Sequence, residues 1–155
     1  MLAKDLMTET TVLVRKDMLI TELALLLREK RIGGVPVIDE SGKICGIVTV
    51  TDLFNVMNIA RRVGGRRNWF SNFMFSKKTM TVKDIYTRKI YSVLPDTPIE
   101  VVISLMLDKS IHTIPVMNEQ QSELYGVIGR HDVTCAGLGI AAPRKTAAAA
   151  DTRTA

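Results

Sequence analysis

The hydrophobic pattern of residues 11–62 changes its period several times and predicts two helices and three strands, after a short lead-in helix expected at residues 3–7. Apolar residues recur at three- and four-residue spacing from about Leu19 to Arg31, as in an amphipathic helix. A second helix is expected to begin at Thr51 and Asp52, because Thr51 can accept a hydrogen bond from a first-turn N–H and Asp52 complements the helix dipole. Runs rich in β-branched residues and bounded by turn residues predict strands at 11–14, 35–38 and 43–50. The predicted order is β-α-β-β-α.

The same order of elements occurs a second time. The segment Gly46-Ile47-Val48 with Asp52 recurs as Gly126-Val127-Ile128 with Asp132. The matching pairs of segments are Lys4–Leu6 with Lys83–Ile85, Asp17 with Asp96, and Ile32–Val37 with Ile111–Val116. The offset is 79 residues and becomes 80 after one extra turn residue near Gln120. A register kept over this length indicates an internal duplication.

The composition fits a small globular protein. The chain has 155 residues, of which 46% are hydrophobic and 24% charged, and neither half is large enough to bury its apolar surface alone. No apolar run reaches the length of a membrane span and the N-terminus lacks a signal pattern, so a cytoplasmic location is expected. Cys45 and Cys135 occupy non-equivalent positions of the two repeats and are expected to be reduced, buried thiols.

The repeated motifs resemble the cystathionine-β-synthase (CBS) domain. They are Met-Thr at the start, Gly-Val-Pro-Val-Ile-Asp in the middle, and Gly-Ile-Val-Thr-x-x-Asp-Leu at the end. The two copies together resemble a tandem CBS pair, or Bateman module. The resemblance implies an α+β fold with two β-α-β-β-α repeats related by a pseudo-two-fold axis, two related clefts between them, and a homodimer formed through helices. The expected domains are repeat one at 1–57 and repeat two at 81–139.

The resemblance also implies an adenine nucleotide ligand, AMP, ADP or ATP, in each cleft. The aspartates Asp52 and Asp132 are expected to bind ribose hydroxyls, and Thr49 to lie near phosphate. Gly129 replaces that threonine in repeat two, where Arg130 is expected to contact phosphate instead. Repeat one is therefore expected to carry the tighter site. The predicted nucleotide-binding residues of both repeats are Thr11, Val12, Gly34, Val35, Pro36, Thr49, Thr51, Asp52, Ile90, His112, Thr113, Ile114, Pro115, Arg130, His131 and Asp132.

Catalysis finds no support in the sequence. No Ser-His-Asp or Cys-His order stands out, and there is no phosphate-binding Gly-rich loop that ends in Lys-Ser or Lys-Thr. The only histidines, His112 and His131, are too few for a metal site. The sequence therefore predicts a regulatory protein that requires no cofactor and senses a nucleotide, with S-adenosylmethionine as another ligand to test. The rival interpretation is a structural dimerisation or protein-interaction module with vestigial clefts. The regulated partner is not identified.

Residues 58–80 are not explained by the repeat. They contain six Lys and Arg residues and no acidic residue, so the rest of the chain has a net charge of 5 − 6 = −1. Nucleic-acid binding by the whole protein is therefore not expected. Three accounts of this basic and aromatic insert stay open: a solvated linker, a clamp over the ligand, and a docking surface for membrane or nucleic acid. Its rings, Trp69, Phe70, Phe73 and Phe75, favour packing on the module or across its dimer. Residues 140–155 are expected to form a flexible tail.

Overall fold

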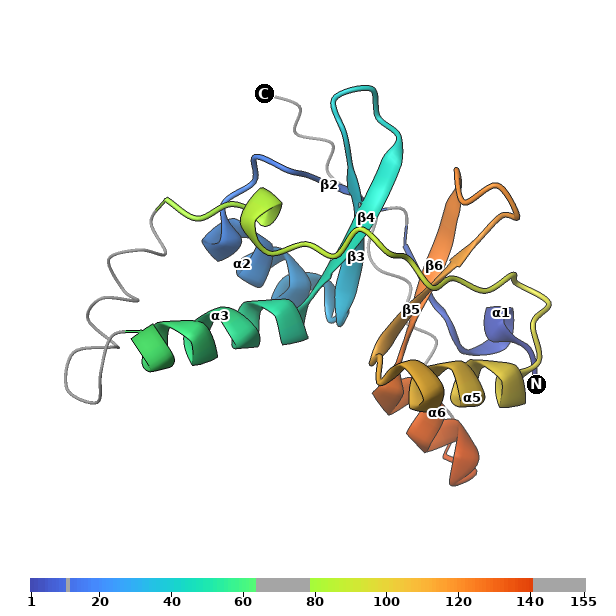
Figure 1. The fold of residues 1–155 in the computed structure, drawn as a ribbon. Helices are drawn as coiled ribbons and strands as arrows, with labels where there is room; N and C mark the ends of the chain where they lie inside the picture. The colour runs from blue at the N-terminus through green and yellow to red at the C-terminus, as the bar shows by residue number, and fades with distance from the viewer. Residues whose placement is uncertain (11, 64–78, 141–155) are drawn as a thin grey trace. The chain divides into compact units, whose positions relative to one another are not determined.

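The computed structural model describes residues 1–10, 12–63 and 79–140, which form two compact units (Figure 1). One unit contains the sheet β2-β3-β4 and is called the β4 unit; its described residues are 13–29, 34–63 and 79–89. The other contains the sheet β1-β6-β5 and is called the β6 unit; its described residues are 1–10, 12, 30–33 and 90–140. Each sheet has three strands and is accompanied by helices, so the predicted mixed α+β fold with two repeats is confirmed.

The β4 unit is built around an antiparallel hairpin. Its elements are β2 (Val14–Arg15), α2 (Ile20–Lys30, whose last residue is outside the unit), β3 (Gly34–Ile38), β4 (Ile44–Thr49), α3 (Val50–Val63) and a 3-10 helix, η1 (Val82–Asp84). Strand β3 pairs antiparallel with β4 and parallel with β2. Its core consists of branched aliphatic side chains that are almost completely buried: Val14, Ile20, Leu23, Leu27, Val35, Val37 and Val48.

The β6 unit repeats this plan. Its elements are α1 (Ala3–Leu6), β1 (Thr8–Glu9), α5 (Ile99–Lys109), β5 (Thr113–Met117), β6 (Leu124–Gly129) and α6 (Arg130–Gly137). Strand β6 lies between β1 and β5 and is antiparallel to both. Helices α5 and α6 contact each other, and both lie at one end of the β5-β6 hairpin (Figure 1). The buried cluster of this unit is Ala3, Val93, Val102, Met106, Ile114, Val116 and Ile128.

Each compact unit combines most of one repeat with the N-terminal segment of the other repeat. In the β6 unit, Thr8 of β1 pairs with Val127 of β6. In the β4 unit, Thr87 and Ile47 exchange two backbone hydrogen bonds, each 2.8 Å from nitrogen to oxygen. These two pairs are equivalent by the duplication offset. The lead-in segments therefore supply an additional backbone partner to each hairpin.

Sequence periodicity predicted the long elements well. The helix expected at about Leu19–Arg31 is confirmed as α2, and the expected hairpin as β3 and β4. The strand expected at 11–14 is wrong in extent, since β2 covers only Val14–Arg15 and Thr11 lies outside the described residues. Strand β1 was not predicted, because a two-residue strand formed by a non-local partner has no period of its own.

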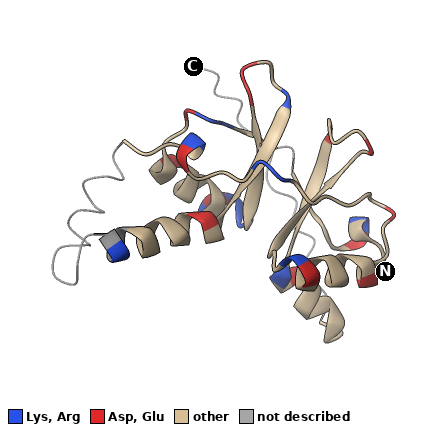
Figure 2. Cartoon of the chain, in the orientation of Figure 1, with Lys and Arg blue, Asp and Glu red and all other residues tan. Residues whose placement is uncertain are grey.

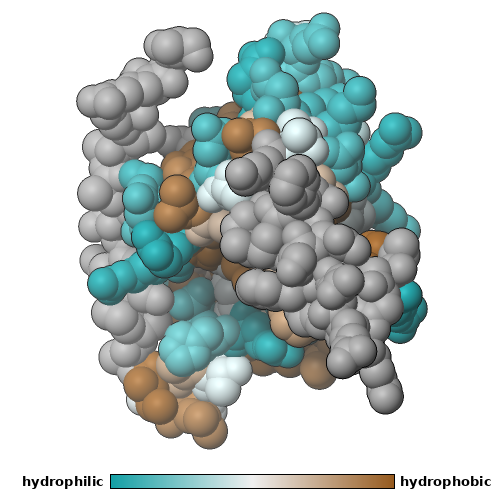
Figure 3. Space-filling view, turned by 90° about the vertical axis from the view of Figure 1, so that its left-hand side faces the viewer, coloured by the Kyte–Doolittle hydropathy of each residue, from teal (hydrophilic) through white to brown (hydrophobic). Residues whose placement is uncertain are grey.

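Charged residues of both signs are interspersed along the described elements of both units (Figure 2). Hydrophobic residues also reach the surface on the side displayed in Figure 3, where they lie among hydrophilic ones. None of the helices within the described ranges is long and apolar enough to cross a membrane. The central part of the basic and aromatic insert, 64–78, and residues 141–155 of the tail lie outside the described residues, so their predicted roles stay predictions.

The first prediction concerns the glycine at which a lead-in segment crosses a hairpin. A Cβ atom built on Gly46 would lie 2.5 Å from the backbone oxygen of Thr87, far inside van der Waals contact. Because backbone must move to relieve this overlap, the substitution Gly46→Ala is expected to lower the free energy of unfolding by about 1–3 kcal/mol. Urea unfolding followed by circular dichroism measures the change.

The control is Gly137→Ala at the end of α6, where an added Cβ meets nothing within 4 Å. Alanine is the better helix former, so the control is expected to be neutral or stabilising by up to about 1 kcal/mol. Equal stability of the Gly46→Ala variant and the wild type would contradict the proposed close approach.

Candidate functional site

The sequence motif of repeat one folds into a strand-to-helix junction. Strand β4 ends at Thr49 and α3 begins at the next residue, Val50. The backbone N and the Oγ1 of Thr49 both donate to Oδ2 of Asp52, at 2.7 Å each, and the backbone N of Asp52 donates back to Oγ1 of Thr49 at 3.3 Å. This reciprocal arrangement is a capping box, which satisfies N–H groups that the first helical turn leaves unpaired. It fixes the position of the Asp52 carboxylate.

The predicted helix start was wrong by one residue in repeat one. Thr51 was predicted to cap this helix, whereas the structure gives that role to Thr49, and Thr51 is an exposed residue of the first turn. Helix α6 begins at Arg130, two residues before Asp132. In both repeats the aspartate therefore sits at the third helical position, where a carboxylate reaches back to the residue before the helix.

The junction of repeat two has fewer bonds. The backbone N of Gly129 donates to Oδ2 of Asp132 at 2.9 Å, but glycine has no hydroxyl to add a second bond. The backbone N of Arg130 donates to the backbone oxygen of His112 at 2.9 Å, which ties the start of α6 to the residue before β5. His131 lies in the first turn of α6, and its Nε2 is 3.6 Å from Sγ of Cys135.

Each hairpin pairs a glycine with a threonine at the end of its strand ladder, but the two residues are on opposite strands in the two hairpins. In the β4 unit Gly34 is opposite Thr49, and a Cβ at Gly34 would lie 2.8 Å from Cγ2 of that threonine. In the β6 unit the buried Thr113 is opposite Gly129. Each strand end therefore has room for one threonine side chain, placed on different strands in the two repeats. The loss of a threonine at Gly129 was predicted from the sequence, but the threonine gained at Thr113 was not, although the aligned repeats contain it opposite the glycine of the other repeat.

The structure brings most predicted site residues together within their own units. In the β4 unit, Gly34, Val35 and Pro36 on β3 pair with the strand that leads into the Thr49–Asp52 junction. In the β6 unit, β5 and the start of α6 contain the predicted residues His112, Thr113, Ile114, Pro115, Arg130, His131 and Asp132. Val35, Pro36, Ile114 and Pro115 are buried, so these four support the site from the core.

Three predicted residues have no place in these junctions. Val12 and Ile90 are half-buried, belong to the β6 unit and lie in no helix or strand. Thr11 lies outside the described residues. Among the residues that the structure describes, no three His, Cys, Asp or Glu side chains gather to hold a metal ion.

The chain belongs to the CBS domain family and carries two CBS domains in tandem. The profile of the CBS domain matches residues 3–59 and residues 82–139. The chain is also similar to the uncharacterized protein MJ1426 of Methanocaldococcus jannaschii, with 24% identity over 151 residues that cover 86% of this chain and 89% of the relative. It spans only 22% of the length of two further curated relatives, so the activities of those longer proteins are not transferred to it.

Two solved structures share the fold. The CBS domain pair of protein MJ0100, solved in complex with 5′-methylthioadenosine and S-adenosyl-L-methionine, has a TM-score of 0.69 and 22% identity over 90% of this chain and 97% of that one. CBSX2 from Arabidopsis thaliana, solved in complex with AMP, has a TM-score of 0.63 and 25% identity over 90% of this chain and 97% of that one. A tandem CBS pair is therefore the fold of this chain.

The second prediction tests the two caps. Replacement of Asp52 by alanine removes the acceptor of two short hydrogen bonds, whereas Asp132→Ala removes the acceptor of one. Loss of such a cap typically costs about 0.5–2 kcal/mol, so Asp52→Ala is expected to fall near the upper end and Asp132→Ala near the lower end. Chemical denaturation of both variants measures the difference.

The conservative variant Asp52→Asn is the control, because its amide oxygen still accepts a hydrogen bond and most of the stability should return. If Asp132→Ala proves more destabilising than Asp52→Ala, then the bonds from Thr49 do not contribute as argued.

Proposed function

We propose that this CBS pair is a non-catalytic regulatory module that binds an adenine nucleotide at its two strand-to-helix junctions. The observation that carries the proposal is the state of the two aspartates. All hydrogen bonds that the described residues make to Asp52 and Asp132 go to Oδ2, which leaves Oδ1 to accept bonds from a ligand. Both side chains are half-buried, so each carboxylate is fixed yet accessible.

The chemistry of the junctions suits a nucleotide. A fixed carboxylate accepts short, charge-assisted hydrogen bonds from the two hydroxyls of a ribose. The first turn of α3 or α6 presents N–H groups and the positive end of a helix dipole, which favour a phosphate nearby. Arg130 is exposed in the first turn of α6 and adds a cation there, whereas its counterpart in α3 is Val50. The adenine ring is proposed to lie against the backbone near Gly34 and, in repeat two, beside His112.

The comparisons support this class of ligand. CBSX2, 25% identical to this chain, was solved in complex with AMP, and the protein MJ0100 with two adenosine derivatives. These ligands belong to those proteins; they make AMP, ADP, ATP and S-adenosyl-L-methionine the appropriate probes for this one. We propose that AMP binds more tightly at Asp52 than at Asp132, because two bonds from Thr49 orient the first carboxylate and a single backbone bond orients the second.

Regulation requires that the nucleotide bind one conformation better than another. The homodimer, the regulated partner and the cytoplasmic location stay predictions from the sequence. A second candidate function, a module for protein interaction, is favoured by exposed apolar side chains on α3. Phe54 and Ile59 are 64% and 62% exposed there, and apolar side chains exposed together on one helix can mark an interaction surface. Under this alternative, substitution of the two aspartates would change no ligand affinity.

The third prediction tests the nucleotide site directly. The variant Asp52→Asn keeps the cap but removes the charge, so it is expected to weaken AMP binding roughly tenfold or more, as for one lost hydrogen bond to a charged group. Asp132→Asn is expected to have a smaller effect. Isothermal titration calorimetry with AMP, ADP, ATP and S-adenosyl-L-methionine on the wild type and both variants measures these affinities.

The matched control is Asp108→Asn, which removes one exposed carboxylate from α5 outside the junctions and should leave every affinity unchanged. If the folded wild type binds none of the four probes at millimolar concentration, the nucleotide proposal is wrong. A larger effect of Asp132→Asn than of Asp52→Asn on AMP binding would instead reverse the assignment of the tighter site.

A further inference from the structure

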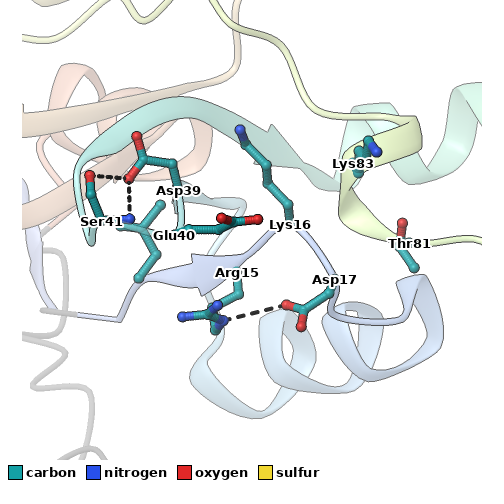
Figure 4. Close-up of a pocket in the computed structure, with 9 residues that line it drawn as sticks. Arg15, Lys16, Asp17, Asp39, Glu40, Ser41, Thr81 and Lys83 are labelled. Atoms are coloured by element: carbon teal, nitrogen blue, oxygen red, sulfur yellow. Dashed lines mark hydrogen bonds and ion pairs between the residues drawn. The ribbon is translucent and has the colours of Figure 1, made fainter.

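A polar cavity lies in the β4 unit, at the other end of the sheet from the Thr49–Asp52 junction. It has a volume of about 700 Å³ and is open to solvent. Its walls come from the residues after β2, from the turn between β3 and β4, and from the lead-in segment at Thr81–Lys83 (Figure 4). The register places Gly34 beside the junction and Ile38 beside the cavity, and four residues of strand span roughly 13 Å. The cavity is therefore distinct from the proposed nucleotide site.

Two of the three carboxylates in the cavity are already engaged. Asp39 accepts hydrogen bonds at Oδ1 from the backbone N and the hydroxyl of Ser41, at 2.9 and 2.6 Å, and from the backbone N of Lys43 at 3.0 Å. These bonds, led by that from the Ser41 hydroxyl, hold the pKa of Asp39 below its usual value. The carboxylate of Asp17 forms an ion pair with Arg15, with 3.5 Å between Oδ1 and Nε.

Three charged groups remain for a ligand. In the part of the chain that the structure describes, neither Lys83 nor Glu40 has a hydrogen-bond or ion-pair partner for its side chain, and Figure 4 draws no dashed line to either. The ammonium group of Lys16 lies 5.7 Å from the centre of the Tyr86 ring, and its charge also helps to lower the pKa of Asp39. The six charged side chains of the lining, three basic and three acidic, have a net charge of 3 − 3 = 0.

The duplication supplies an internal comparison. Lys4 is the counterpart of Lys83 and pairs with Asp96 at 2.6 Å, whereas Asp17, the counterpart of Asp96, is held by Arg15. The residues of repeat two that correspond to Arg15 and Lys16 are Leu94 and Pro95. At this place the β4 unit therefore has two cations, Arg15 and Lys16, that the β6 unit lacks. Because Arg15 pairs with Asp17, Lys83 does not form the ion pair that its counterpart Lys4 forms with Asp96.

We propose that this cavity binds a small acidic α-amino acid, of the class of aspartate and glutamate. The two carboxylates of such a ligand complement Lys16 and Lys83, and its ammonium group complements Glu40. The cavity volume lies within the range of about 300–1,000 Å³ that is usual for small-molecule sites. The site is independent of the nucleotide proposal and would give the module a second signal.

The test is a titration of the full chain with L-glutamate and L-aspartate, followed by calorimetry and by NMR shifts of backbone amides. Binding in the millimolar range or tighter is expected. N-acetyl-L-glutamate, which lacks the ammonium group, and L-glutamine, which lacks one carboxylate, are expected to bind about tenfold more weakly. The variants Lys83→Gln and Glu40→Gln are expected to weaken glutamate binding by a similar factor, while their repeat-two counterparts Lys4→Gln and Glu119→Gln leave it unchanged.

Several results would overturn the proposal. The first is that neither glutamate nor aspartate binds to the folded wild type at about 10 mM, a concentration that would reveal a dissociation constant near 1 mM. The second is that Lys83→Gln binds glutamate as tightly as the wild type does. The third is that inorganic phosphate binds as tightly as glutamate. Loss of glutamate binding in Asp52→Asn would show that glutamate occupies the junction and not this cavity. Glutamate binding that survives in Asp52→Asn supports the second site whether or not AMP binds, so the two proposals stand or fall separately.

Discussion

The missing side chains of Gly46 and Gly126 are the constraint on which both units depend. A Cβ at Gly46 would lie 2.5 Å from the backbone oxygen of Thr87, and one at Gly126 would lie 2.6 Å from that of Thr8. Glycine at these two positions lets the lead-in segment lie this close to the hairpin strand without overlap with a side chain. This pairing gives each hairpin a backbone partner from the N-terminal segment of the other repeat, which the hairpin's own repeat does not supply.

The same hairpins determine where the helices begin. Because β3 and β4 pair in a fixed register, Thr49 lies opposite Gly34 at the end of the ladder, and the chain leaves the sheet directly into α3. The hydroxyl of Thr49 and the carboxylate of Asp52 then satisfy each other. A residue pair that stabilises the helix start thus also orients the carboxylate proposed to bind ribose, so only a substitution that keeps the hydrogen-bond acceptor, such as Asp52→Asn, separates binding from stability at this point.

The limits of sequence reasoning follow from the range of the interactions involved. Helix α2 has its own apolar period and was predicted from it, and the duplication identified both aspartates. Strand β1 was missed because only its partner β6 makes Thr8–Glu9 a strand. Thr51 was mistaken for the cap because Thr49 and Thr51 both suit that role chemically, and the end of the β4 ladder decides between them. Residues 64–78 lie outside the described residues, so the role of the insert rests on sequence alone.

The two repeats share a backbone plan and differ in how equivalent charges are used. Lys4 and Lys83 occupy the same position, yet the first is held by an aspartate and the second is not. The difference arises from one position: Arg15 pairs with Asp17 in repeat one, whereas its counterpart in repeat two, Leu94, has no charge and leaves Asp96 to Lys4. Since an exposed ion pair contributes only about 0–1 kcal/mol, exchanging one partner for another costs little stability. A duplicated fold can therefore acquire a new charged surface in one copy while the other retains the original pairing.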